Sequence, residues 1–233
     1  MSEQVSQAVA RVGEAAGVIE ASIGEFAKLL PPSVKPETFG RWSLSMIKRA
    51  LGDAKQYEAW SRVLDPANPA GLASVMSGLM DAAALGLEPG REYHLVPFGG
   101  TVTGITDYKG EVRLITNAVA KSVVVAKLVR ANDVFRAIGA NCPPTHEARD
   151  DDWFADRGPV TGGYAFVDYA GETCSDVVIM PETAYSPDQD SFLHHREKAK
   201  TKTVWDEWPE AMRKKTLVHQ LRKIVPWAIE RQW

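Results

Sequence analysis

Residues 92–117 read EYHLVPFGGTVTGITDYKGEVRLITN, and this stretch decides the fold. Two short runs rich in β-branched and aromatic residues flank the pair Gly99–Gly100, which is typical of a tight β-hairpin turn. From Lys109 to Asn117 the pattern changes and indicates a short helix. The stretch therefore predicts a hairpin followed directly by a helix.

Two helical patterns precede this hairpin. In the first, helical spacing is kept by Phe39, Trp42, Met46 and Arg49 or Ala50. In the second, the apolar residues are Leu72, Val75, Met76, Leu79 and Ala83, at i, i+3, i+4, i+7 and i+11. Gly86 is expected to cap the second helix, and Pro89 prevents its continuation.

Strands and one long helix are expected after the hairpin. SVVVAKLV, residues 122–129, reads as a buried strand. GGYAFVDY and TCSDVVIM read as a second hairpin that turns across residues 170–172. A long helix starts near Val204, and Pro226 kinks or ends it. We therefore expect an α+β fold, in which an antiparallel hairpin sheet packs on a long helix behind a helical N-terminal region.

Residues 1–30 are expected to form a separate arm. They are rich in Ala and Glu, and Pro31 and Pro32 stop them. We expect this arm to be helical or partly ordered. It has some apolar residues at helical spacing but too little length and burial to be stable alone, so we expect it to dock on a neighbouring subunit. Residues 31–233 then form the main domain.

The charges are distributed unevenly along a chain of 233 residues with a formal net charge of −3. Residues 147–190 hold eleven acidic residues against two arginines, whereas residues 192–231 hold ten Lys or Arg against five acidic residues. A surface with one basic side is typical of nucleic-acid binding, although two solvated faces are the plainer alternative. Apolar runs stay short of the ~20 residues of a membrane helix, so we expect a soluble, cytoplasmic chain without a membrane partner.

The C-terminal helix separates apolar from basic residues. Its apolar face collects Leu217, Val218, Leu221, Ile224 and Val225. Its opposite face collects Lys215, His219, Arg222 and Lys223. Such a helix can dock on the sheet while it presents a cationic stripe to phosphate oxygens. An ordinary amphipathic surface helix is the alternative.

Five ordered blocks give the chain a family resemblance. They are LGLEPG (85–90), EYHLVPFGG (92–100), ITDYKGEVRL (105–114), RGPVTGGYAFV (157–167) and WPEAMRKKTLVHQLRKIVP (208–226). In this order they resemble the RecT family of phage single-strand annealing proteins, over roughly residues 31–226. The most specific parts are Tyr108-Lys109-Gly110 and the MRKKT block, residues 212–216.

The resemblance implies an α+β core related to the eukaryotic strand-annealing mediators. It implies subunits assembled side by side into rings, arcs or helical filaments, with DNA in a continuous basic groove. It also implies a phage 5′→3′ exonuclease and the host single-strand binding protein as partners, and a phage or prophage protein in the bacterial cytoplasm. His219 departs from the pattern, because a permanently charged residue is expected there, so groove charge is expected to depend on pH.

Further candidate DNA contacts lie outside the last helix. Lys109 lies at the start of a helix whose free backbone amides favour phosphate binding. Tyr108 either stacks on a base or fills the end of the hairpin. Arg113 either extends the basic patch or forms a surface salt bridge. Arg157 either reaches DNA or pairs with Asp151 or Asp152. The remaining candidates are Lys198, Lys200 and Lys202, which alternate along a segment expected to be a mobile loop. They either clamp a DNA strand or are simply solvated.

Enzymatic alternatives have weaker support. The sequence holds no G-x-x-x-x-G-K-[ST] loop for ATP. Cys142, His146 and Cys174 fall short of the four ligands of a structural zinc site, so a hydrogen-bonded structural role for His146 is favoured. The acidic run at residues 150–152 reads as a solvated loop, because two-metal sites need carboxylates that converge from separate elements. We therefore expect no catalytic residue, metal or cofactor.

The sequence thus predicts a homo-oligomeric protein that binds single-stranded DNA in a basic groove and promotes ATP-independent annealing of complementary strands in phage recombination. Annealed duplex is the expected intermediate. Two alternatives stay open: a passive single-strand coating protein, and a metal-dependent nuclease that uses the acidic loop.

Overall fold

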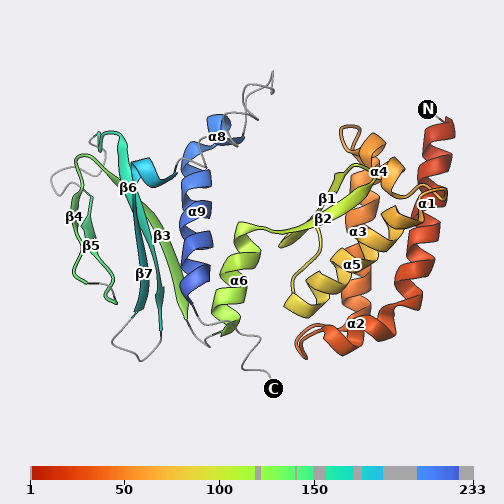
Figure 1. The fold of residues 1–233 in the computed structure, drawn as a ribbon, viewed down its shortest axis with the longest axis horizontal. Coiled ribbons are helices and arrows are strands. Elements are labelled where there is room, and N and C mark those ends of the chain that lie inside the picture. Colours follow the sequence, from red (N-terminus) through yellow and green to blue (C-terminus); the bar gives the residue numbers. More distant parts are fainter. Residues whose placement is uncertain are drawn as a thin grey trace. The chain divides into compact units, whose positions relative to one another are not determined.

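The computed structural model describes residues 2–118, 122–139, 141–148, 156–169, 175–185 and 204–225. The chain divides into two compact units, Met1–Gly110 and Glu111–Trp233 (Figure 1). Helices and antiparallel strands make up both units, which confirms the expected α+β class. Within the described residues, no helix combines the length and the apolar character that crossing a membrane requires.

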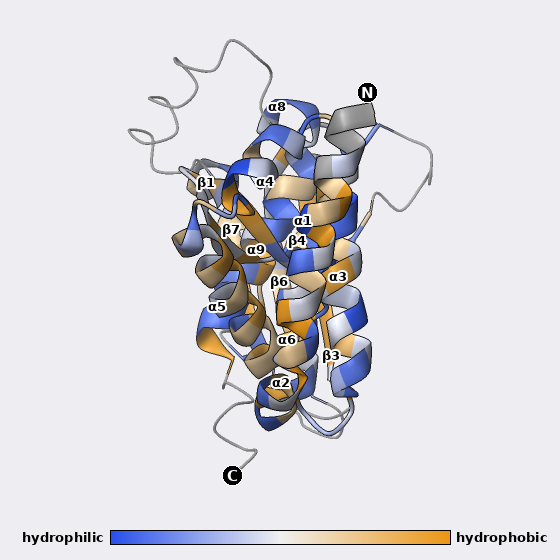
Figure 2. Cartoon of the chain, turned by 90° about the vertical axis from the view of Figure 1, so that its right-hand side faces the viewer, coloured by the Kyte–Doolittle hydropathy of each residue, from blue (hydrophilic) through white to orange (hydrophobic). Residues whose placement is uncertain are grey.

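The first unit consists of helices and one hairpin. Its elements are α1 (Ser2–Ala21), α2 (Ile23–Leu29), α3 (Pro36–Gly52), α4 (Tyr57–Val63), α5 (Pro69–Leu85), β1 (Tyr93–Phe98) and β2 (Thr101–Thr106). Its core includes the rings of Phe26 and Phe39, which meet edge to face with centroids 5.1 Å apart. Figure 2 shows α5 as mostly apolar, whereas α1 and α3 alternate between polar and apolar residues.

Residues 1–30 form two helices that pack on their own chain. Ala15 and Ile19 of α1 and Phe26 of α2 are buried. α1 packs against α3, and α2 packs against α3 and α5. Docking of these helices on a neighbouring subunit stays a prediction.

Local sequence explains where α5 begins and ends. The Asn68 side chain accepts a hydrogen bond from the Gly71 amide at 3.2 Å, and Pro69 takes the first helical position. Gly86 ends the helix with φ 66°, a left-handed conformation that glycine adopts without strain. The predicted cap at Gly86 is confirmed.

The first predicted hairpin is also confirmed. β1 and β2 pair in antiparallel register from Tyr93↔Thr106 to Phe98↔Thr101, around a turn in which Gly99 and Gly100 both have positive φ. Helix α5 packs against this hairpin.

The second unit holds a three-stranded antiparallel sheet of order β3-β6-β7. Helix α6 (Tyr108–Ala118) leads into it from the end of the first unit. The other elements are β3 (Val123–Arg130), β4 (Val134–Arg136), β5 (Thr145–Glu147), β6 (Val160–Asp168), β7 (Ser175–Pro181), the 3-10 turn η1 (Glu182–Tyr185), α8 (Val204–Glu207) and α9 (Pro209–Ile224). α9 lies along the sheet and contacts all three strands (Figure 1). The predicted helix at 109–117, the strand at 122–129 and the pairing of the second hairpin are confirmed. This strand was expected to be buried, but within β3 only Leu128 and Val129 are.

Two parts of the second unit differ from expectation. The last helix does not run unbroken from Val204, because Pro209 restricts the residue before it, and Trp208 leaves the helical conformation with φ −132° and ψ 56°. The small hairpin of β4 and β5 was not expected, because each strand has only three residues and carries little periodic signal.

Candidate nucleic-acid interface

The apolar face of α9 attaches the helix to the sheet. Leu217, Val218 and Leu221 are fully buried. Gly163 of β6 allows the close approach, because a Cβ there would lie 2.9 Å from Leu217 Cδ1. Ile224, which was expected on this face, is half exposed at the end of the helix. Val225, also expected on this face, is buried, so the docking face reaches the end of the helix and Ile224 alone departs from the sequence pattern.

Three lysines of α9 stand without an acidic partner among the described residues. Lys214 and Lys223 are exposed, and Lys215 is half-buried. The Lys223 ammonium donates to the Gln220 side-chain oxygen at 3.2 Å, which leaves its charge uncompensated. These three residues are called the α9 lysines below. Arg213 is different, because its guanidinium donates to both carboxylate oxygens of Glu182.

His219 and Arg222, predicted on the open face, both contact the carboxylate of Glu111 on α6. His219 Nδ1 lies 2.7 Å from Glu111 Oε1, and Arg222 Nη1 lies 3.6 Å from the same atom. The side chain of Glu111 is 4% exposed, that of Arg222 17% and that of His219 52%. Because a buried carboxylate needs positive partners, part of the predicted stripe neutralises Glu111 inside the second unit.

The start of α6 presents a lysine. The Asp107 side chain accepts a hydrogen bond from the amide of Tyr108, the first residue of the helix, at 2.7 Å. Lys109 is exposed and has no ion pair among the residues described, whereas Tyr108 is half-buried. Both belong to the first unit. Arg113, in the second unit, is half-buried.

Arg157 pairs with a buried aspartate. Its Nε and Nη2 donate to the two oxygens of Asp133 at 2.7 and 2.6 Å. The partners that the sequence suggested, Asp151 and Asp152, lie outside the described residues. The Asp133 side chain has no exposed surface. Burial by itself would raise the pKa of Asp133, but hydrogen bonds from Arg157, from His146 and from the Arg130 amide outweigh it and hold that pKa well below its usual range.

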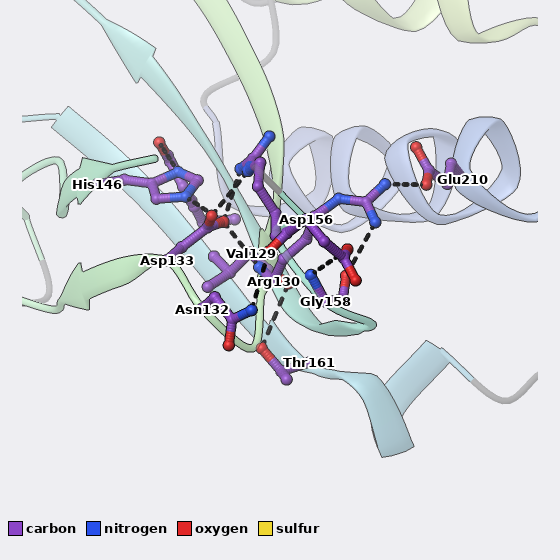
Figure 3. Close-up of polar contacts among 11 residues, drawn as sticks. Val129, Arg130, Asn132, Asp133, His146, Asp156, Gly158, Thr161 and Glu210 are labelled. Carbon is purple, nitrogen blue, oxygen red and sulfur yellow. Dashed lines mark hydrogen bonds and ion pairs between the residues drawn. The ribbon is translucent and has the colours of Figure 1, made fainter. Parts of the chain in front are cut away.

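His146 completes this network (Figure 3). Its Nε2 lies 2.9 Å from Asp133 Oδ2, and its Nδ1 lies 3.2 Å from the Tyr164 hydroxyl oxygen. Since an ionised carboxylate only accepts hydrogen bonds, Nε2 carries a proton. His146 therefore has the hydrogen-bonded structural role that the sequence favoured. Within the described residues, no group of three or more His, Cys, Asp or Glu side chains is arranged to hold a metal ion.

Comparison with known protein families supplies the decisive observation. The family model described as RecT family matches residues 44–233, most of the chain. The chain belongs to the RecT family. A comparison with curated proteins found no match.

RecT-family membership confirms the resemblance drawn from the sequence blocks. It makes this chain a member of a family of single-strand annealing proteins of DNA recombination. Single-stranded DNA is the partner that membership implies. Proteins of this family are annealing proteins and in general not catalytic enzymes.

Several predicted residues of this RecT-family chain lie outside the described residues. They are Lys198, Lys200, Lys202, Cys174 and the acidic run at 150–152. Sequence reasoning missed other residues that matter to the interface. Lys214 was visible as part of the MRKKT block, but Glu111 and Asp133 carried no signal, because a buried acidic residue looks the same in sequence as an exposed one.

Proposed function

We propose that this RecT-family protein binds single-stranded DNA through the α9 lysines in a basic groove of a homo-oligomer, and promotes annealing without ATP hydrolysis. The main support is the contrast between the two sides of α9. Leu217, Val218 and Leu221 attach it to the sheet, while Lys215 and Lys223 on the other side have no described carboxylate to neutralise them, and neither has the exposed Lys214 near the start of the helix. Such cations are available to phosphate oxygens, which every sequence presents alike.

The structure supports the other predicted DNA contacts to different degrees. Lys109 is supported by its exposure at the start of α6, where free amides favour an anion, and Tyr108 and Arg113 extend the same helix. Arg157, His219 and Arg222 already contact a buried carboxylate, so DNA has to compete for them.

Annealing then needs no chemical step by the protein. Basic residues neutralise the phosphates of two strands that would otherwise repel each other, and the bases stay available for pairing. Stacking in the new duplex supplies about 1.4 kcal/mol per base-pair step, so no nucleotide hydrolysis is required. We also propose rings or helical filaments as the working assembly, with a phage 5′→3′ exonuclease and the host single-strand binding protein as partners.

An annealing assay tests the function. Two complementary labelled oligonucleotides are mixed with the full chain, with and without ATP and with and without EDTA. We expect faster duplex formation that neither ATP nor EDTA changes. Binding without faster annealing identifies a passive coating protein, and EDTA-sensitive shortening of the strands identifies a nuclease; either result refutes the proposal.

A salt titration tests the residues. The logarithm of the affinity should fall linearly with the logarithm of the salt concentration, and Lys215→Ala should reduce the slope by about 0.7, the value for one phosphate on a single strand. Lys28→Ala is the matched control, because this exposed lysine of α2 is already paired with Glu25 at 2.7 Å. Equal slopes for the two variants would show that Lys215 does not contact the DNA.

A further inference from the structure

A polar pocket in the first unit has no role in the proposal above. It is a cavity of about 320 Å³ between α3, α4 and the start of β1. The residues that matter here are Arg49, Asp53, Gln56, Trp60, Gly90 and His94. Its volume is at the lower end of the roughly 300–1,000 Å³ range of ligand sites, which suits a small group rather than a whole macromolecule.

Trp60 brings an unused donor to this pocket. The residue is 1% exposed, and its indole N–H has no hydrogen-bond acceptor among the described residues. Buried donors are nearly always paired, and an unpaired one in a native protein calls for an explanation. A ligand oxygen in the pocket would provide the missing acceptor.

Arg49 brings an uncompensated charge. It is exposed on α3 and has no ion pair or side-chain hydrogen bond within the described part of the chain. Gly90 leaves space for the Arg49 side chain, because a Cβ on Gly90 would lie 3.1 Å from Arg49 Nη2 and 2.8 Å from Met46 Cγ. The backbone φ of 78° at Gly90 independently favours glycine. The guanidinium therefore lies against the backbone at the pocket wall.

The other polar groups of the pocket are one histidine and one already hydrogen-bonded acidic residue. Asp53 accepts from the Lys55 amide and from the Gln56 side-chain amide, both at 2.9 Å, one bond on each of its oxygens. His94 Nε2 lies 3.8 Å from Asp107 Oδ2, within ion-pair range but beyond hydrogen-bond distance, so the imidazole can still hydrogen-bond a ligand.

We propose that this pocket binds one phosphodiester group of the single strand, with Arg49 as its charge partner and the Trp60 indole and His94 as further donors. An anionic ligand that only accepts hydrogen bonds matches Arg49 and the Trp60 indole, two donors without a described acceptor, and His94 adds a third. A nucleobase edge carries no negative charge to match the guanidinium of Arg49. The nearby charges of Asp53 and Asp107 favour a singly charged diester over a doubly charged terminal phosphate. The inference takes its ligand from the proposed function and adds a DNA contact on the first unit.

The test measures binding of a labelled oligothymidylate, and of an abasic oligonucleotide of the same length, to the full chain over a range of salt concentrations. Arg49→Gln should reduce the salt slope by about 0.7 for both strands. Lys48→Gln is the control, since the neighbouring lysine of α3 has the same charge but lies at a different, apolar groove between α1 and α3. Trp60→Phe should weaken binding roughly three- to tenfold without changing the slope. Urea unfolding of each variant shows that the protein is folded.

The outcomes separate the two proposals. If the wild-type chain does not bind the strands, the proposed function fails and this inference fails with it. If the wild type binds and Arg49→Gln behaves like Lys48→Gln, only the pocket assignment is refuted. A loss confined to the base-containing strand would assign the pocket to a nucleobase. Displacement of the Arg49-dependent binding by inorganic phosphate, at matched ionic strength, would assign it to free phosphate. Each of these last two results also overturns the inference.

Discussion

Asp133→Asn should destabilise the second unit by about 3 kcal/mol. The wild-type carboxylate is fully buried and accepts from Arg157 twice, from His146 and from the Arg130 amide. Asparagine keeps one oxygen as an acceptor, but its NH₂ group replaces the other oxygen and then faces N–H donors that have lost their acceptor. Removing one partner of a buried ion pair costs about 3–5 kcal/mol. The lower end applies here, because the Arg157 side chain is 35% exposed and can recover hydrogen bonds from water.

Urea unfolding measures this cost. With a slope near 2 kcal/mol per molar urea, a loss of about 3 kcal/mol lowers the midpoint by about 1.5 M. Amide hydrogen exchange should show where stability is lost, with faster exchange in β4 and β5. His146 lies on β5 and contacts Tyr164 of the sheet, so the hairpin should loosen when Asp133 no longer holds His146. Asp156→Asn is the control. Asp156 is exposed in the same loop as Arg157 and accepts one amide hydrogen bond from Gly158, which asparagine can keep, so its cost should stay below about 0.5 kcal/mol.

The difference between wild type and Asp133→Asn should depend on pH. The folded-state pKa of Asp133 lies below its unfolded value of about 3.9, so the ionised form stabilises the fold fully above that value. The stabilisation is lost progressively as the pH falls from about 4 toward the folded-state pKa. The reasoning is refuted if Asp133→Asn costs no more than Asp156→Asn at neutral pH, or if the difference between wild type and variant does not shrink in acid.

Three further changes follow from the same geometry. Gly163→Ala would place a Cβ 2.5 Å from the Tyr185 hydroxyl oxygen, 2.8 Å from the Lys127 carbonyl oxygen and 2.9 Å from Leu217 Cδ1, so urea unfolding should show a loss of about 1–3 kcal/mol. Gly139→Ala has open space and should cost little; similar midpoints would contradict the close packing around Gly163. Glu111→Gln removes the carboxylate charge that His219 and Arg222 contact. If either residue then contacts a phosphate, the slope of the logarithm of the affinity for single-stranded DNA against the logarithm of the salt concentration should steepen by about 0.7. An unchanged slope would show that neither residue contacts the DNA. His219→Arg should tighten DNA binding at about pH 8, because it adds a permanent charge, and His219→Gln should not; equal affinities of wild type and both variants would exclude a contact between His219 and DNA.

The sequence by itself determined the elements that rest on local rules. The Gly99–Gly100 pair predicted the hairpin turn, Gly86 predicted a helix end, and apolar spacing predicted α5, β3 and the docking residues of α9. These predictions succeed because turn conformation, helix capping and the helical period depend on neighbouring residues alone. Ordered sequence blocks also sufficed to indicate the RecT family and hence the class of partner.

Only the tertiary structure decided which charges remain available for DNA. Arg222 and Lys215 lie seven residues apart on the same side of α9, yet α6 brings the buried Glu111 to Arg222 and leaves Lys215 without a described acidic partner. Arg157 meets Asp133 across a separation of 24 residues, and Arg213 meets Glu182 across 31. Periodicity shows which face of a helix a residue occupies, but not what packs against that face. Whether a basic side chain stays uncompensated depends on contacts between distant segments, and those exist only once the chain has folded.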